Sequence, residues 1–200
     1  MSGDLVLLTD RSQLRLGRGL VRTVRECAAA GLRTVVVREH DLALAERAAL
    51  VARLRDVPGL TVLASRTLVP GAHGVHLAAA QPGTGVGRSC HDLAEVAAAV
   101  AAGASYVTVS PFAATASKPG HGPALAPATY AAARRLTAGS ATRVLALGGV
   151  DARNAAAAVA AGAHGVAVMG AVMRSDDPAA EVAALLAGLA QRRDARGAVA

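Results

Sequence analysis

The chain has 200 residues, of which 53% are hydrophobic and 18% are charged, and its formal net charge is +7 at pH 7. This length suits about one domain, and the composition excludes a disordered chain. The two cysteines, Cys27 and Cys90, exclude a disulfide-stapled scaffold and a zinc cluster built on thiolates. The positive charge does not predict nucleic-acid binding, because the arginines are scattered and aromatic residues, on which bases would stack, make up only 2% of the chain.

Two stretches without formal charge, 96–117 and 154–173, approach the length of a membrane span. Both consist mostly of Ala and Gly and contain polar residues, whereas a spanning helix needs about 20 strongly apolar residues. Each stretch is better interpreted as a buried helix followed by a buried strand. The N-terminus has no basic segment followed by a long apolar one, so we expect no signal peptide and a cytoplasmic protein.

Short β-branched segments alternate with Ala- and Leu-rich stretches along the chain. Near-continuous apolar strands separated by helices are typical of a parallel sheet covered on its outer face. Eight such strands predict a single-domain (β/α)8 TIM barrel, and the open doubly wound alternative lacks a GxGxxG motif after its first strand. The expected strands are 5–10, 34–39, 61–66, 74–79, 86–90, 106–111, 143–149 and 165–170, and the expected helices lie near 20–30, 42–55, 92–102, 126–137, 152–161 and 178–192.

An internal repeat supports the barrel. Residues 98–110 and 157–169 have similar sequences, and each contains the end of a helix, a glycine and then a strand. A glycine at this point supplies the left-handed conformation that ends many helices. The repeat spans two β/α units, as expected of a barrel built from repeated units. We assign the domain to residues 1–192 and expect residues 193–200 to form a mobile tail.

Active sites of such barrels lie at the C-terminal ends of the strands, and a phosphate often binds to the loops after strands seven and eight. These loops contain Gly149 and Gly170. Backbone N–H groups of glycines can approach an anion closely, so we predict a phosphate site there.

Basic and polar residues follow the other strands. Arg38, Arg66 and Lys118, the last being the only lysine, predict a second anion site at the same mouth. His40 and His121 also fall at this end and are candidates for general acid/base chemistry. The spacing of the histidines does not indicate a metal site.

Seven segments together resemble the thiamine phosphate synthase and TenI family of barrels, namely 7–11, 35–40, 74–77, 86–96, 106–120, 145–155 and 160–178. The synthase joins a pyrimidine methyl diphosphate to a thiazole phosphate with Mg²⁺ and releases pyrophosphate. The resemblance implies that the thiazole phosphate contacts Gly149, Met169, Gly170 and Thr115. It also implies that Arg38, Ser89 and Lys118 hold the pyrophosphate.

The chain departs from the synthase pattern at the metal. Ser65 and Gln81 stand where the family has its magnesium carboxylates, and neutral oxygens bind Mg²⁺ far more weakly than carboxylates do. His40 stands where the synthase has a lysine, and Pro111 stands where the TenI branch, a thiazole tautomerase, has its histidine.

We therefore expect tautomerase-like proton transfer on a small phosphorylated substrate, with no metal or other cofactor and with His40, His121 and Lys118 as the catalytic residues. One alternative is a thiamine phosphate synthase, which would need Mg²⁺. Another is a non-catalytic protein that binds thiazole phosphate or thiamine phosphate. We expect no nucleic-acid or membrane partner, and the sequence leaves a homo-oligomer open.

Overall fold

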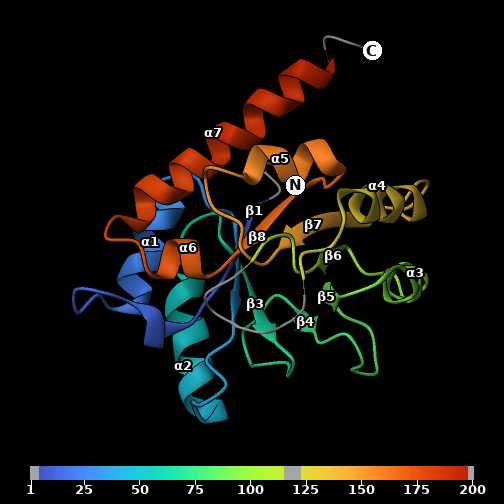
Figure 1. Ribbon diagram of the computed structural model, residues 1–200. Helices are drawn as coiled ribbons and strands as arrows, with labels where there is room; N and C mark the ends of the chain where they lie inside the picture. Colours follow the sequence, from blue (N-terminus) through green and yellow to red (C-terminus); the bar gives the residue numbers. More distant parts are fainter. Residues whose placement is uncertain (1–4, 115–122, 198–200) are drawn as a thin grey trace.

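The computed structural model describes residues 5–114 and 123–197, which form a closed barrel of eight parallel strands surrounded by helices (Figure 1). Each strand pairs with the next along the chain, and the last pairs with the first. The prediction of a (β/α)8 barrel is confirmed. The strands are β1 (Leu5–Leu8), β2 (Thr34–Val37), β3 (Thr61–Ser65), β4 (Val75–Leu77), β5 (Gly87–Cys90), β6 (Tyr106–Val109), β7 (Arg143–Leu147) and β8 (Gly165–Val168).

Most of the strands are apolar on both faces, because one face packs inside the barrel and the other packs against the helices. In β1, Val6 and Leu8 belong to the cluster inside the barrel, whereas Leu5 and Leu7 belong to the larger cluster that includes the helices. This follows from the alternation of side chains along a strand. The interior cluster consists of Val6, Leu8, Val36, Leu63, Tyr106, Leu145 and Ala167.

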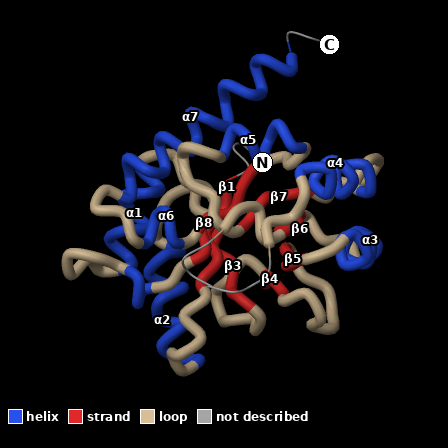
Figure 2. The backbone as a smooth tube through the Cα atoms, viewed as in Figure 1, coloured by secondary structure: helices blue, strands red, loops and turns tan. Residues whose placement is uncertain are grey.

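Helices cover the outside of the barrel (Figure 2). All six expected helices are present, and residues 66–86 contain no helix, as the short links after the third and fourth strands predict. Two short elements were not expected, the 3-10 helix η1 (Arg11–Gln13) and the one-turn helix α6 (Gly170–Met173). The other helices are α1 (Leu20–Ala29), α2 (Leu44–Arg55), α3 (Leu93–Ala101), α4 (Pro127–Leu136), α5 (Ala155–Ala161) and α7 (Pro178–Gly197).

The observed boundaries differ from the expected ones at the C-terminal ends of most strands and at the end of the last helix. Most expected strands extend one or two residues beyond the observed ends. After β7, for example, Gly148 and Gly149 have φ values of +92° and +67°, which cannot continue a strand. Helix α7 continues to Gly197, into the expected tail at 193–200, and reaches beyond the barrel (Figure 1).

The internal repeat corresponds to the α3–β6 and α5–β8 units. In the second unit Gly162 has a φ of +125°, and a Cβ at this position would lie 2.7 Å from backbone atoms of Ala131. Glycine is therefore required both by its conformation and by the close approach of α4. None of the helices that the structure describes combines the length and the apolarity needed to cross a membrane.

Candidate functional site

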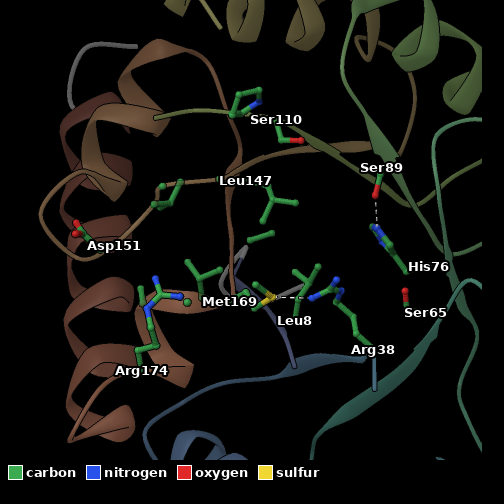
Figure 3. A pocket seen from close by; sticks show the side chains of 18 of the residues that line it. Leu8, Arg38, Ser65, His76, Ser89, Ser110, Leu147, Asp151, Met169 and Arg174 are labelled. Carbon is green, nitrogen blue, oxygen red and sulfur yellow. Dashed lines mark hydrogen bonds between the residues drawn. The ribbon is translucent and has the colours of Figure 1, made fainter. Parts of the chain in front are cut away.

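The C-terminal ends of the strands surround a cavity of about 710 Å³ (Figure 3). The structure brings together there every predicted site residue that it describes. Three others, Thr115, Lys118 and His121, lie outside the described residues. The predicted residues that line the cavity are Arg38, His40, Arg66, Ser89, Gly149, Met169 and Gly170.

Arg38 extends from the end of β2 across the mouth of the barrel. Its backbone N–H donates to Thr9 Oγ1 at 3.1 Å, and its Nη1 donates to Met169 Sδ at 2.7 Å. The neighbouring carboxylate of Glu39 is buried and accepts from both the backbone N–H and Nη1 of Arg11. Glu39 is thus engaged by another arginine, so Arg38 presents positive charge to the cavity.

Arg66 follows β3 in a left-handed conformation with a φ of +65°, which costs a residue with a side chain about 1–3 kcal/mol. Three hydrogen bonds hold this conformation. The Arg66 N–H donates to the His76 carbonyl at 2.8 Å, and Gln81 Nε2 donates to the Arg66 carbonyl at 2.6 Å. The buried Arg47 donates to the adjacent Ser65 carbonyl at 2.9 Å. Strain held in this way is common at ligand sites.

His40 lies beside these arginines, and its Nε2 is 3.4 Å from Ser65 Oγ. Its pKa is lowered from the usual value of 6.5, first by partial burial and then by the charges of Arg66, Arg38 and Arg47. The imidazole is therefore neutral at pH 7 and can accept a proton. We call the half of the mouth formed by Arg38, His40 and Arg66 the arginine side.

The opposite half, which we call the glycine side, consists of Gly149, Gly170 and Arg174. A Cβ on Gly149 would lie 2.4 Å from the Ala114 carbonyl oxygen, so this glycine allows the loops after β6 and β7 to approach closely. In α6 the N–H groups of Val172 and Met173 donate to the Met169 carbonyl. Gly170 is the first residue of α6 and lines the cavity, and its N–H lies before these first intrahelical bonds.

The sequence analysis did not identify Arg174. A Cβ on Gly170 would lie 2.3 Å from Arg174 Nη2, so the guanidinium lies directly over Gly170. Arg174 Nη1 also donates to Gln13 Oε1, and Gln13 Nε2 donates to Asp10 Oδ2 at 2.6 Å. Figure 3 shows Arg38 and Arg174 on either side of Met169. The only sequence signal was the spacing of four residues from Gly170, which places both residues on one helix face.

Two further residues that the sequence analysis did not assign to the site, Tyr106 and His76, form a hydrogen-bonded group with the predicted residue Ser89. His76 Nδ1 is 2.9 Å from the Tyr106 hydroxyl, and His76 Nε2 is 3.0 Å from Ser89 Oγ. A Cβ on Gly87 would lie 2.2 Å from Tyr106 Cζ, so this glycine makes room for the tyrosine ring. Burial, then the charges of Arg38 and Arg88, lower the pKa of His76 to about 4. His76 is therefore neutral at pH 7.

The residues of the mouth do not fit Mg²⁺, the metal that the family resemblance implies. Gln81 Oε1 accepts from the Ala78 N–H at 3.2 Å, and Gln81 Nε2 donates to the Arg66 carbonyl. Both ends of this side-chain amide are therefore hydrogen-bonded to backbone groups and not directed at a metal ion. Of the cavity carboxylates, Asp151 pairs with Arg153 and Glu181 accepts from the Ala152 N–H. Within residues 5–114 and 123–197, no group of three or more His, Cys, Asp or Glu side chains could hold a metal ion.

The chain is similar to known proteins along almost its whole length. The family model described as "Thiamine monophosphate synthase" matches residues 68–172. A putative thiamine-phosphate synthase of Geobacter sulfurreducens is 39% identical, with 94% of this chain and 95% of the relative covered. A thiamine-phosphate synthase of Methanoculleus marisnigri is 32% identical, with 92% and 94% covered. The solved thiamine phosphate pyrophosphorylase of Pyrococcus furiosus has the same fold, with a TM-score of 0.78, 21% identity, and 94% and 96% covered.

Proposed function

This chain belongs to the thiamine monophosphate synthase family, and we propose that it binds a thiazole phosphate at the mouth of the barrel and moves protons on it without a metal. The observation that carries the proposal is the set of groups on the arginine side. Ser65 and Gln81 replace the carboxylates expected there, and Gln81 is bonded to backbone at both ends of its amide. The cations Arg38 and Arg66 face the cavity instead and can bind an anion directly.

The two sides of the mouth suit the two ends of a thiazole phosphate carboxylate. On the glycine side the Gly149 and Gly170 backbone and the Arg174 guanidinium would hold the phosphate. On the arginine side Arg38 and Arg66 would orient the carboxylate. Two anchors at opposite ends fix the thiazole ring between them, which is the positioning that proton transfer requires.

His40 would move the proton. As a neutral base it would remove a proton from one atom of the non-aromatic tautomer, and a proton would return at another atom as the aromatic ring forms. The reaction is an isomerisation, so no group leaves and the proton count does not change. His121 and Lys118 stay candidates for the second proton transfer.

A thiamine phosphate synthase is the second candidate. It is favoured by the two relatives described above, which are named as a putative thiamine-phosphate synthase and a thiamine-phosphate synthase and match more than nine-tenths of the chain. That reaction would join a pyrimidine methyl diphosphate to thiazole phosphate. The residues of the mouth do not fit its Mg²⁺, so substrate oxygens and water would have to hold the ion.

One pair of assays separates the candidates. The purified protein is incubated in EDTA with the non-aromatic tautomer of thiazole phosphate carboxylate, and the aromatic product is followed by NMR. In parallel it is incubated with pyrimidine methyl diphosphate, thiazole phosphate and Mg²⁺, and thiamine phosphate is measured by chromatography. We expect turnover in the first assay only. Turnover in the second assay alone would establish the synthase, and tight binding without turnover in either would indicate a non-catalytic binding protein.

A further inference from the structure

We propose that Tyr106 and His76 are positioning residues that turn the Ser89 hydroxyl into a directed hydrogen-bond donor for an anionic oxygen of the ligand. The identity of that oxygen as the thiazole carboxylate rests on the proposed function. We call the hydrogen-bonded series of Tyr106, His76 and Ser89 the relay. Its three side chains come from neighbouring strands, with His76 on β4, Ser89 on β5 and Tyr106 on β6.

The three side chains lead from the closed interior of the barrel to the cavity. Tyr106 is 1% exposed and His76 is 3% exposed, whereas Ser89 is half-buried and lines the cavity. The Tyr106 hydroxyl is 2.9 Å from His76 Nδ1, and His76 Nε2 is 3.0 Å from Ser89 Oγ. Figure 3 shows the ring of His76 directed at Ser89. The His76 and Tyr106 rings also stack, with centroids 5.5 Å apart.

The surroundings of Tyr106 decide which nitrogen of His76 carries the proton. The Tyr106 hydroxyl has a single proton, and the other side chains of the interior cluster and those packed against it are the apolar ones of Val, Leu, Ala and Met. Thr108, two residues along on the same face of β6, has an Oγ1 without a hydrogen-bond partner, so it does not accept from Tyr106. If His76 Nδ1 were protonated, the tyrosine proton would be buried without an acceptor, which is costly. Tyr106 therefore donates to Nδ1, and Nε2 carries the proton.

The direction of the last hydrogen bond follows. His76 Nε2–H donates to Ser89 Oγ, so the serine proton is not used within the relay. Among the described residues, His76 is the only hydrogen-bond partner of Ser89 Oγ. The serine proton is therefore available to the cavity, where Arg38 and Arg66 attract an anion. Because His76 is neutral at pH 7, the relay keeps this direction at that pH.

The first test is the tautomer of His76 in the protein without ligand. Long-range ¹H–¹⁵N correlation spectra of the ¹⁵N-histidine-labelled protein distinguish Nε2–H from Nδ1–H. We expect His76 to be a single Nε2–H tautomer, and Tyr106→Phe to abolish this preference. An Nδ1–H tautomer in the unmodified protein would overturn the proposal.

Tyr130→Phe is the matched control. Tyr130 is also completely buried, and its hydroxyl donates to the Val109 carbonyl at 3.2 Å, away from the cavity. Both variants remove one buried phenolic hydroxyl and keep the ring. A loss that comes only from packing or stability would appear in both, whereas a change in the His76 tautomer should appear only in Tyr106→Phe.

The second test is ligand binding by calorimetry with three probes: thiazole phosphate carboxylate, thiazole phosphate and inorganic pyrophosphate. We expect Ser89→Ala and Tyr106→Phe each to weaken binding of the carboxylate probe about tenfold, and the double variant to bind no more weakly than Ser89→Ala. Thiazole phosphate, which lacks the carboxylate, should bind within twofold of the unmodified protein in all variants.

The probes separate the failure of the relay from the failure of the proposed function. If no thiazole probe binds, but Tyr106→Phe and Ser89→Ala weaken pyrophosphate binding and Tyr130→Phe does not, the proposed function is wrong and the relay stands. If Tyr106→Phe binds every probe as Tyr130→Phe does, the relay is overturned whatever the natural ligand is.

Discussion

The two sides of the mouth are built in different ways. The glycine side depends on the backbone, with Gly149 allowing two loops to meet and Gly170 leaving space for the guanidinium of Arg174. The arginine side depends on side chains, with Arg66 held in a left-handed conformation and the pKa of His40 lowered by burial and by the charges of three arginines. The family resemblance implies phosphate contacts at the glycine side, whereas it implies other residues than Ser65, Gln81 and His40 at and beside the arginine side. The proposed function therefore keeps a phosphate anchor on the glycine side and changes the chemistry on the arginine side.

The largest expected effect concerns the base on the arginine side. Replacing His40 by Ala should lower the tautomerisation rate about a hundredfold or more, because general-base catalysis contributes this much. Ligand affinity should change little, since the phosphate anchor lies on the other side of the mouth. Steady-state kinetics and calorimetry measure the two quantities.

His73→Gln is a suitable control for this prediction, because His73 lies at the other end of the barrel, where its ring accepts from the Val62 N–H at 2.9 Å. Its rate should stay within about threefold of the unmodified protein. An unchanged rate in His40→Ala would remove His40 from the mechanism.

The next largest effect concerns the backbone of the glycine side. Gly149→Ala should destabilise the fold by about 3 kcal/mol, because it combines left-handed strain with a Cβ placed 2.4 Å from a carbonyl oxygen. Urea unfolding measures this change. Gly103→Ala is the control, since Gly103 has a φ of +75° but no atom within 4 Å of its Cβ position. It should lose only the strain, about 1 kcal/mol. Equal losses would contradict the close approach of the two loops.

A comparable effect of pH is expected from the interior below the arginine side. The pKa of His76 is about 4 in the folded protein, against 6.5 for an unperturbed histidine. Between these values the unfolded chain binds more protons, so stability should fall as the pH is lowered from 6.5 to 4, by about 3 kcal/mol at most. His76→Gln cannot titrate and isolates this contribution from that of the carboxylates. Parallel urea-stability curves for the two proteins would contradict a neutral, buried His76.

The smallest effect concerns the strain on the arginine side. Arg66→Gly removes a side chain from a position with a φ of +65°, so it should stabilise the fold by about 1 kcal/mol. The same change should weaken binding of the carboxylate ligand, because one of the two cations is lost. Thermal unfolding and calorimetry would show opposite changes. A loss of stability would mean that the Arg66 side chain supports the fold and not the ligand.

The order of the elements could be predicted from the sequence because the barrel repeats one pattern, a β-branched strand followed by a helix. The short elements η1 and α6 could not, since three or four residues are too few to show a periodicity. The expected strands also end one or two residues later than the observed ones, because the sequence pattern does not mark the last residue of a strand. Alternation of apolar residues does not show that Gly148 and Gly149 turn the chain.

The site could be predicted as far as it depends on position along the strands. Arg38, His40 and Arg66 meet the glycines at one mouth because the strands are parallel. The contacts of Arg174 with Gln13, and of His76 with Tyr106 and Ser89, depend on the register and closure of the barrel. Residues far apart in the chain form them, and no local pattern marks such pairs.

The rate of tautomerisation with and without a metal tests the central claim most directly. The purified protein would convert the non-aromatic thiazole phosphate carboxylate in EDTA and again with added Mg²⁺. We predict equal rates, since the described carboxylates that line the cavity, Asp151 and Glu181, are engaged within the protein, and the proposed base is the His40 imidazole. No conversion under either condition, together with Mg²⁺-dependent formation of thiamine phosphate, would contradict the claim.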